Sequence, residues 1–348
     1  MKPVRVLIVD DSAVVREHLR RIISADGRLE VAGVAATGEE AIEMVKSIAH
    51  DVISMDIHLP GIQGFEATRR IMALRPTPIV IVSGIELPEV NLSMEALRCG
   101  ALSLVEKPAA ATHESFNALA SRLCTQLALM SEVKVVKQRG LSLRRSFLPS
   151  DRATSAGGYA MVGIGASTGG PNAIMQVLNG LGRNFPLPVV LVQHMTPGFV
   201  GGFAEWLAGV TPFPVSVVRA RTKLNPGHAY VAPSGFHLAI DGLSARLEDT
   251  PPIGNHRPSV TALFSSIARS FAASAIGVLL TGMGEDGASG LHDIRAAGGF
   301  TITEAESTAI VYGMPAAAVR IGAACEVLPL GDIGQRILAL PLSGSKEK

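Results

Sequence analysis

The stretch Tyr159-Ala-Met-Val-Gly-Ile-Gly-Ala-Ser-Thr-Gly-Gly-Pro171 runs from an apolar strand through a glycine-rich turn into the start of a helix. Its residues 165–169 fit the pattern G-x-S-x-G, in which glycines permit a tight strand-to-helix turn that exposes a serine hydroxyl. The helix start directs backbone N–H groups toward whatever lies above the serine. The motif leaves two interpretations of Ser167 open: a catalytic nucleophile, or part of an anion-binding loop.

Apolar strand patterns alternate with helical patterns through the second half of the chain. The predicted strands cover residues 160–166, 188–193, 215–219, 276–281, 300–303 and 325–328, and the predicted helices cover residues 172–181, 200–207, 260–272, 287–297, 316–321 and 333–340. Three short segments, residues 229–231, 237–240 and 245–247, predict an inserted antiparallel ribbon. The alternation predicts an α/β domain over residues 159–345, with its function at the carboxyl ends of the strands.

The first half of the chain, residues 1–125, shows the same alternation. Its predicted strands cover residues 4–9, 29–34, 52–55, 78–82 and 102–105, and its predicted helices cover residues 12–23, 39–48, 65–74, 90–99 and 114–129. Ser12 is the predicted N-cap of the first helix. We therefore expect two doubly wound parallel-sheet domains, joined by a basic linker of little periodicity over residues 126–158.

Composition narrows the class of protein. A length of 348 residues predicts two domains, and 47% hydrophobic residues suffice for two packed cores. A net charge of +1 favours neither nucleic acid nor an anionic membrane, and the three separated cysteines indicate reduced thiols. No signal-peptide pattern opens the sequence, and no apolar run reaches the ~18 residues of a membrane span. We expect a cytoplasmic protein with no nucleic-acid partner and no direct membrane insertion.

Acidic residues follow two strands of the first domain. Asp10 and Asp11 come after the first strand and Asp56 after the third, so all three should meet at one edge of the sheet. Clustered carboxylates without histidine or cysteine favour a hard cation such as Mg²⁺. Ser83 and Lys107 end the fourth and fifth strands and add a hydroxyl and an ammonium that fit a phosphoryl group. The alternative, helix caps and a surface cation, suits each residue singly but poorly explains all five in order.

The second domain carries partners for a catalytic serine. His194 ends the second strand of that domain, next to the strand that ends at Ser167. Asp286 lies in a glycine-rich loop after a buried strand, where its carboxylate could orient an imidazole. The order Ser, His, Asp differs from the order of α/β-hydrolases, so a different parallel sheet is implied.

Each of these assignments has an alternative. His256, in the polar cluster at residues 255–258, is a second candidate base. Glu285 is the rival carboxylate beside Asp286, which could itself cap the following helix. Arg257 could bind an anionic substrate or form a surface ion pair.

Residues 4–125 resemble a response-regulator receiver domain, which has a flavodoxin-like fold. The resemblance implies that Asp56 accepts a phosphoryl group from a histidine kinase, that Asp10, Asp11 and Asp56 hold Mg²⁺, and that Ser83 and Lys107 sense the phosphoryl group. The chain departs from the receiver pattern twice. Leu104 stands where many receivers carry an aromatic switch residue, and Gln63 precedes Gly64 where aspartate is usual.

The second domain resembles the catalytic domain of the chemotaxis protein-glutamate methylesterases. The motifs are Gly-Ile-Gly-Ala-Ser-Thr-Gly-Gly, Gln-His-Met, His-Arg-Pro-Ser-Val and Leu-Thr-Gly-Met-Gly-Glu-Asp-Gly-Ala, in that order. The resemblance implies that Ser167 is the nucleophile, His194 the base and Asp286 its orienter. It also implies an oxyanion or substrate pocket formed by Thr168, Met283, His256 and Arg257.

The two resemblances together imply a phosphorylation-activated carboxylic ester hydrolase. It would demethylate glutamate methyl esters on chemoreceptor cytoplasmic domains, releasing methanol, and deamidate glutamines there, with no cofactor in the catalytic domain. A chemotaxis histidine kinase would be the phosphodonor. Two other outputs are possible for a receiver. A DNA-binding module fits poorly, because the second domain is too long and not basic, and a dinucleotide-binding module would need an acidic residue where His194 stands.

Overall fold

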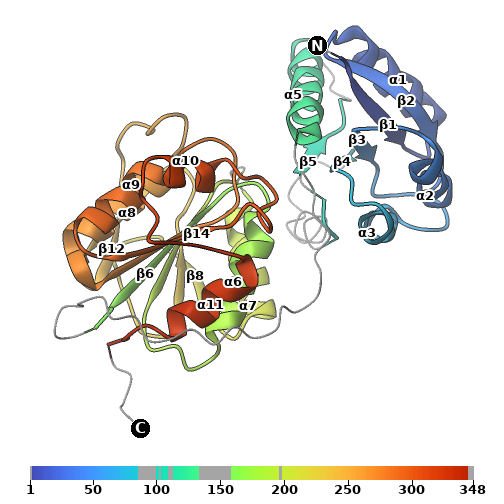
Figure 1. Cartoon of the computed structure of the whole chain (residues 1–348). Coiled ribbons are helices and arrows are strands. Elements are labelled where there is room, and N and C mark those ends of the chain that lie inside the picture. The colour runs from blue at the N-terminus through green and yellow to red at the C-terminus, as the bar shows by residue number, and fades with distance from the viewer. Residues whose placement is uncertain are drawn as a thin grey trace. The chain divides into compact units, whose positions relative to one another are not determined.

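The computed structural model divides the chain into two units, Met1–Lys137 and Gln138–Lys348 (Figure 1). The described residues are 2–84, 99–101, 103–108, 113–132, 158–195 and 198–343. The helix predicted over residues 90–99 lies almost wholly outside them, as does most of the predicted linker 126–158. Within the described ranges no helix is both long and apolar enough to cross a membrane. The three cysteines, all described, form no disulfide.

The first unit is built on a five-stranded sheet of order β2-β1-β3-β4-β5, in which all neighbours are parallel. Its strands are β1 Val4–Val9, β2 Leu29–Ala35, β3 Val52–Met55, β4 Ile79–Ser83 and β5 Ser103–Glu106. From β1 the chain adds β2 on one side and the other strands on the opposite side. The carboxyl ends of β1 and β3 therefore flank the topological switch point, where doubly wound sheets bind their ligands. The predicted flavodoxin-like sheet is confirmed.

The helices of the first unit cover both faces of that sheet. They are α1 Ala13–Ala25, α2 Gly38–Ser47, α3 Gly64–Leu74 and α5 His113–Ser131. Ser12 caps α1 by accepting a hydrogen bond from the N–H of Val15, as the sequence predicts. The ring of His18 on α1 stacks on that of Phe116 on α5, while α2 packs against α3. The switch point lies where β1 leads into the start of α1.

The second unit contains a seven-stranded parallel sheet of order β15-β14-β13-β6-β7-β10-β8 (Figure 1). Its strands are β6 Met161–Ala166, β7 Val189–Gln193, β8 Val215–Val217, β10 Ala229–Val231, β13 Ala275–Leu279, β14 Phe300–Glu304 and β15 Glu326–Leu328. The central strand β6 has β7 on one side and β13 on the other. Its carboxyl end, where Ser167 follows, is thus the switch point of this sheet.

One part of the predicted antiparallel ribbon is wrong. Residues 229–231 form β10, which pairs in parallel with both β7 and β8 inside the main sheet. All three side chains of β10 are buried, as befits an interior parallel strand. The separate antiparallel sheet consists of β9 Thr222–Lys223, β11 His237–Asp241 and β12 Ser244–Glu248, in the order β11-β12-β9.

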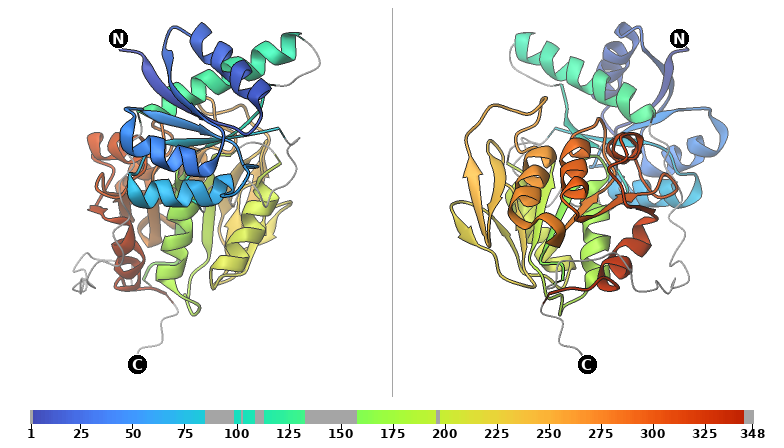
Figure 2. Two further views of the ribbon diagram at one scale, coloured as in Figure 1. Left: turned by 90° about the vertical axis from the view of Figure 1, so that its right-hand side faces the viewer. Right: turned by 60° about the vertical axis from the view of Figure 1, so that its left-hand side comes forward.

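Helices cover the seven-stranded sheet on both faces (Figures 1 and 2). One face carries α8 Val260–Phe271, α9 Ala288–Ala296 and α10 Met314–Arg320, and the other carries α6 Gly170–Leu181, α7 Val200–Val210 and α11 Leu330–Leu338. The short 3₁₀ helix η1, Ala272–Ser274, follows α8. The small antiparallel sheet packs on the other side of α8 through Leu238 and Ile240, which share a core cluster with Phe264.

Two glycines of β6 let α8 lie directly on the sheet. A Cβ at Gly165 would stand 2.1 Å from Cγ1 of Val260, and one at Gly163 would stand 2.5 Å from Cδ1 of Ile267. Any larger residue would push α8 away from the strand. These glycines of the opening motif therefore serve helix-to-strand packing, and the turn beyond them carries the serine.

Candidate functional site

Three carboxylates meet at the switch point of the first unit. Asp10 and Asp11 follow β1, Asp56 follows β3, and one oxygen of each lies within 4.8 Å of the others. Asp10 and Asp56 are only 1% and 4% exposed, whereas Asp11 is open to solvent. The strand order thus brings the three predicted residues together at one edge of the sheet.

Lys107 joins the two buried carboxylates. Its Nζ lies 2.7 Å from Oδ2 of Asp10 and 2.9 Å from Oδ2 of Asp56. Burial raises the pKa of Asp56, and the Lys107 ammonium offsets part of that rise. Burial alone would lower the pKa of Lys107, but its two carboxylate partners raise it above the usual value. Ser83 is buried at the end of β4, and its carbonyl oxygen accepts a hydrogen bond of 2.7 Å from the Lys107 N–H.

The donor set of this cluster fits a hard divalent cation. All three acidic groups offer oxygen, which Mg²⁺ prefers, and one ammonium cannot neutralise three carboxylates. The Asp56 Oδ1 atom already accepts a hydrogen bond of 2.8 Å from the Ile57 N–H, which fixes the carboxylate plane. The opposite oxygen therefore faces Lys107 and the neighbouring acidic residues.

The loop after Asp56 depends on Gly64, whose packing role the sequence does not reveal. A Cβ at Gly64 would stand 1.9 Å from the Asp56 carbonyl oxygen, and the Gly64 N–H donates to the Ile57 carbonyl. The departure at Gln63 leaves this approach intact, since Gln63 precedes α3 without capping it by its side chain. Leu104 lies on β5, paired with Ile81, but its side chain is outside the described part.

Ser167 stands at the switch point of the second unit. Its N–H donates to the Thr281 carbonyl at 3.0 Å, and its own carbonyl accepts from the Gly170 N–H and from Nε2 of Gln193. The same Nε2 atom also donates to the His194 carbonyl at 2.8 Å. One amide thus fixes the backbones of Ser167 and His194 relative to each other. Among the described residues, the Ser167 hydroxyl has no hydrogen-bond partner.

His194 and Asp286 form a buried pair across the ends of β7 and β13. Nε2 of His194 lies 2.8 Å from Oδ2 of Asp286, and the side chains are 10% and 5% exposed. A carboxylate can only accept, so the shared proton sits on Nε2 and leaves Nδ1 with a free lone pair. That Nδ1 atom is buried and, within the described residues, has no hydrogen-bond partner.

Asp286 also occupies the N-terminus of α8. Oδ1 accepts from the Ser259 hydroxyl at 2.7 Å and from the Thr261 N–H at 3.0 Å, and Oδ2 accepts from the Val260 N–H at 2.7 Å. Burial alone would raise the pKa of Asp286, but the hydrogen bonds from His194, Ser259 and Thr261 hold it well below its usual range. Asp286 is therefore a fixed anion that orients the imidazole of His194.

His256 lies against His194 instead of competing with it. The two rings stack in parallel with centroids 3.9 Å apart. Burial, and then the neighbouring His194, lower the pKa of His256. The stacked ring of His256 supports the position of the His194 imidazole.

The structure also shows the surroundings of the other four residues that the sequence singled out. Glu285 is exposed and pairs with Arg320, so it is a poor rival to the buried Asp286. Arg257 pairs with Asp249 at 3.0 Å on the surface. Met283 is half-buried and follows Gly282, where a Cβ would stand 2.7 Å from the Ser167 Cβ. Thr168 is half-buried next to Ser167, and its carbonyl accepts from the Thr281 hydroxyl at 2.9 Å.

Comparisons with known proteins bear on both units. The family profile described as CheB methylesterase matches residues 162–337, and the response regulator receiver domain profile matches residues 6–115. A protein of Paramagnetospirillum magneticum called protein-glutamate methylesterase/protein-glutamine glutaminase 2 is 47% identical over 350 residues, covering 99% of each chain. The chain belongs to the CheB methylesterase family. This confirms the resemblance drawn from the motifs.

Other CheB relatives agree. A Geobacter metallireducens protein called protein-glutamate methylesterase/protein-glutamine glutaminase 4 is 44% identical over 344 residues, covering 97% of this chain and 99% of the relative. The crystal structure of the Thermotoga maritima CheB methylesterase catalytic domain is 35% identical with a TM-score of 0.50, covering 52% of this chain and 97% of that structure. The matched half of this chain corresponds in length to the catalytic domain alone.

The sequence analysis missed one buried acid in this CheB catalytic domain. Glu304 ends β14 with no measurable exposure, and its Oε2 accepts from the Thr281 N–H at 2.9 Å. Thr281 in turn holds Ser167 and Thr168 through its carbonyl and its hydroxyl. Burial raises the pKa of Glu304 to about 7. The available signal was a single acid after an apolar strand that ends at the same sheet edge as Ser167.

Proposed function

We propose that this chain hydrolyses methyl esters of glutamate side chains in proteins and deamidates glutamine side chains, with Ser167 as nucleophile. The observation that carries the proposal is the His194–Asp286 pair at the strand ends that flank the Ser167 turn. Within the described residues the Nδ1 atom of His194 has no hydrogen-bond partner, so its lone pair can accept a proton. The names of the relatives supply the substrate classes, ester and amide. Both are acyl transfers and need the same groups.

In the first step the Ser167 hydroxyl attacks the ester carbonyl. Nδ1 of His194 takes the hydroxyl proton, and Asp286 stabilises the imidazolium that forms. When the tetrahedral intermediate collapses, His194 returns the proton to the leaving oxygen, so methanol departs and the glutamyl group remains esterified to Ser167. With a glutamine substrate the proton goes to nitrogen and ammonia departs.

In the second step water attacks the acyl-enzyme. His194 accepts a proton from that water and then passes it to the Ser167 oxygen, which leaves a glutamate carboxylate and the regenerated serine. The oxyanion of both steps needs donors other than the Ser167 N–H, because that group already bonds the Thr281 carbonyl. We assign this role to the segment at Met283 and to the turn at Thr168, and we assign contacts with the substrate to His256 and Arg257.

The receiver domain supplies control. Asp56 would accept a phosphoryl group from a histidine kinase, and Ser83 and Lys107 would contact it. Asp10, Asp11 and Asp56 would hold a Mg²⁺ ion, which neutralises phosphoryl charge when bound. Phosphorylation adds about −1.5 to −2 charges at the sheet edge and can shift the activity only by its differential effect on two states of the chain.

The partners follow from the same assignment. The substrate would be the cytoplasmic domain of a methyl-accepting chemoreceptor, the phosphodonor a chemotaxis kinase, and the place of action the cytoplasm. Nothing in the net charge of +1 favours a nucleic-acid partner.

Methanol release from methylated receptor membranes tests the proposal directly. We expect release by the full chain, and more of it with a phosphodonor such as acetyl phosphate and Mg²⁺. A chain lacking residues 1–150 should show raised basal release and no response to the phosphodonor. Equal activity of the full chain and the fragment, with no phosphodonor response, would show that the receiver does not restrain the esterase. No methanol from either protein would contradict the proposed reaction.

A further inference from the structure

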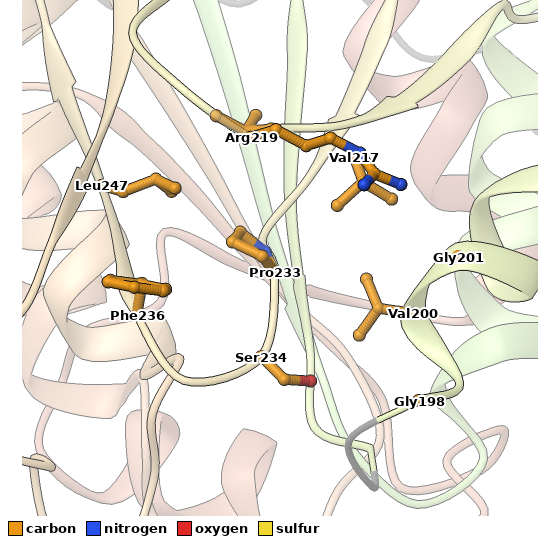
Figure 3. A pocket seen from close by; sticks show the side chains of 10 residues that line it. Gly198, Val200, Gly201, Val217, Arg219, Pro233, Ser234, Phe236 and Leu247 are labelled. Atoms are coloured by element: carbon orange, nitrogen blue, oxygen red, sulfur yellow. The ribbon is translucent and has the colours of Figure 1, made fainter.

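A concave site lies on the same domain as the candidate active site. It is a pocket of about 360 Å³ (Figure 3). Its wall is mostly apolar and comes from the start of α7, the end of β8, the segment after β10 and the small antiparallel sheet. The residues used below are Val200, Val217, Arg219, Ser234, Phe236 and Leu247. None of them belongs to the group proposed for ester cleavage.

The pocket shares the functional edge of the sheet with Ser167. The strand order from the active site outward is β6, β7, β10, β8. Most pocket residues lie at or just beyond the carboxyl ends of β10 and β8, or at the start of α7, the helix that follows β7. Neighbouring strands lie about 4.8 Å apart, so the pocket stands roughly 10–15 Å from the end of β6. That span equals about two to three turns of helix, or three to four residues of extended chain.

Two polar groups in the pocket lack partners. Within the described residues Arg219 forms no ion pair, whereas Arg221, two residues further on, pairs with Asp241 at 3.0 Å. Oγ of Ser234 is buried without a hydrogen-bond partner among those residues, and Figure 3 shows it pointing into the pocket. A buried hydroxyl left unpaired carries a desolvation cost that a bound group can relieve.

A ligand of this pocket must complement its apolar wall, the guanidinium of Arg219 and the hydroxyl of Ser234. A polypeptide substrate continues beyond its reacting glutamate, so its next segment must pass along the sheet edge on one side or the other. We propose that this pocket binds the substrate polypeptide away from the reacting glutamate. An apolar side chain enters between Val200, Val217 and Phe236, and a neighbouring carboxylate of the substrate pairs with Arg219. The proposal rests on the protein-esterase function above and adds a specificity site to it.

If the pocket binds the substrate polypeptide, changes in it should alter the kinetics of protein substrates and not those of small esters. A short ester such as N-acetylglutamate γ-methyl ester reaches Ser167 without reaching the pocket. Changes in the pocket should therefore weaken only the protein substrate, through KM. A change that merely disturbed the fold would lower the turnover of both.

Two pocket variants and two matched controls test this in the full chain with a phosphodonor. Val217→Trp fills the pocket from the edge strand β8, and Val327→Trp makes the same change on β15, the opposite edge strand, where Val327 is 44% exposed. Arg219→Glu reverses the open cation, and Arg221→Glu reverses its neighbour outside the pocket. We expect KM for methylated receptor membranes to rise on the order of tenfold in both pocket variants and in neither control.

The small ester separates the outcomes. The wild-type chain should hydrolyse it, and the pocket variants should do so within about twofold of wild type. Unchanged KM for receptor membranes in both pocket variants would overturn the proposal, as would equal losses on both substrates. Loss of the phosphodonor response with unchanged KM would assign the pocket to the receiver domain and likewise overturn it. Failure of the wild-type chain on both substrates would instead contradict the proposed function.

Discussion

Asp56 and Asp286 are buried carboxylates at the functional edges of two parallel sheets, yet their surroundings shift their pKa values in opposite directions. Burial raises the pKa of Asp56, which faces one ammonium and two further acidic residues. Asp286 accepts hydrogen bonds from an imidazole, a hydroxyl and two backbone N–H groups, which hold its pKa below the usual range despite burial. The number of donors, more than the depth of burial, decides the state of each carboxylate.

The difference matches the two kinds of chemistry. A carboxylate surrounded by donors stays ionised and immobile, which suits an orienting residue. A carboxylate such as Asp56, which has more acidic than basic neighbours, is suited to binding a cation and accepting a phosphoryl group. The comparison predicts that substitutions in the catalytic domain remove turnover, while those in the receiver remove only its control.

The largest expected effect is at Ser167. Ser167→Ala removes the nucleophile, and His194→Ala removes the base, so methanol release should fall by at least about 10³-fold in each. Circular dichroism and thermal unfolding should match wild type for Ser167→Ala, since its hydroxyl bonds no described residue. A folded Ser167→Ala chain with near-native turnover would exclude the serine mechanism.

A smaller loss is expected for Asp286→Asn. The new amide can donate to Nε2 of His194, which would move the imidazole proton to Nδ1 and block proton uptake from the serine. Methanol release should fall about 10²-fold to 10³-fold. Glu285→Gln, one residue away and exposed, is the matched control and should stay within about twofold of wild type. Equal effects of the two substitutions would contradict the role of Asp286.

Asp56→Asn tests the other side of the comparison. The variant should lose phosphorylation and the stimulation by a phosphodonor, while basal methanol release stays within about twofold of wild type. EDTA should do the same to the wild-type chain, because the acidic cluster found among the described residues lies in the receiver. It should leave the activity of a 155–348 fragment unchanged. A fragment inactivated by EDTA would mean that the catalytic domain itself depends on a metal.

The smallest expected change in activity is at Glu304, where pH is the measurement. Burial raises its pKa from 4.5 to about 7, so between these values the folded state holds a proton that the unfolded state has lost. The contribution of Glu304 to the free energy of unfolding should therefore fall by about 3 kcal/mol as pH rises from 4.5 to 7, and stay lower above pH 7.

Glu304→Gln keeps the acceptor for the Thr281 N–H and removes the titration. The difference in unfolding free energy between this variant and wild type should grow in favour of the variant from pH 4.5 to 7, as measured by denaturant unfolding of the full chain. Glu306→Gln, exposed and two residues along, is the control and should follow the wild-type curve. Parallel curves for Glu304→Gln and wild type would mean that Glu304 is ionised in the folded chain.

Patterns that repeat along the chain predicted most of the fold. The alternation of buried strands and amphipathic helices predicted both sheets, because parallel strands are apolar along their whole length. The segment at residues 229–231 was misjudged because three apolar residues do not distinguish an interior parallel strand from a ribbon. Pairing with β7 and β8 depends on contacts that lie far apart in the sequence.

The candidate site was predicted where strand ends carried polar residues in a motif. Ser167, His194 and Asp286 each follow a strand of the same sheet, and topology alone brings such ends together. The stacking of His256 on His194 and the contact of Glu304 with Thr281 have no such signal, since each joins a loop or strand end to a group that only the folded chain brings near. The capping of α8 by Asp286 was equally hidden, because its 26-residue separation from Val260 spans α8, η1 and β13.

The bonds of Asp286 to the start of α8 bear on how this domain can evolve. Active-site residues commonly lower stability, so a lineage that abandons catalysis tends to lose them. Here the carboxylate that orients His194 also satisfies the N–H groups of Val260 and Thr261, so selection for a folded protein alone would retain it. Ser167 has no such second duty. In a descendant that kept only a binding role, the serine would drift while Asp286 persisted, and the presence of Asp286 would be no evidence of an active esterase.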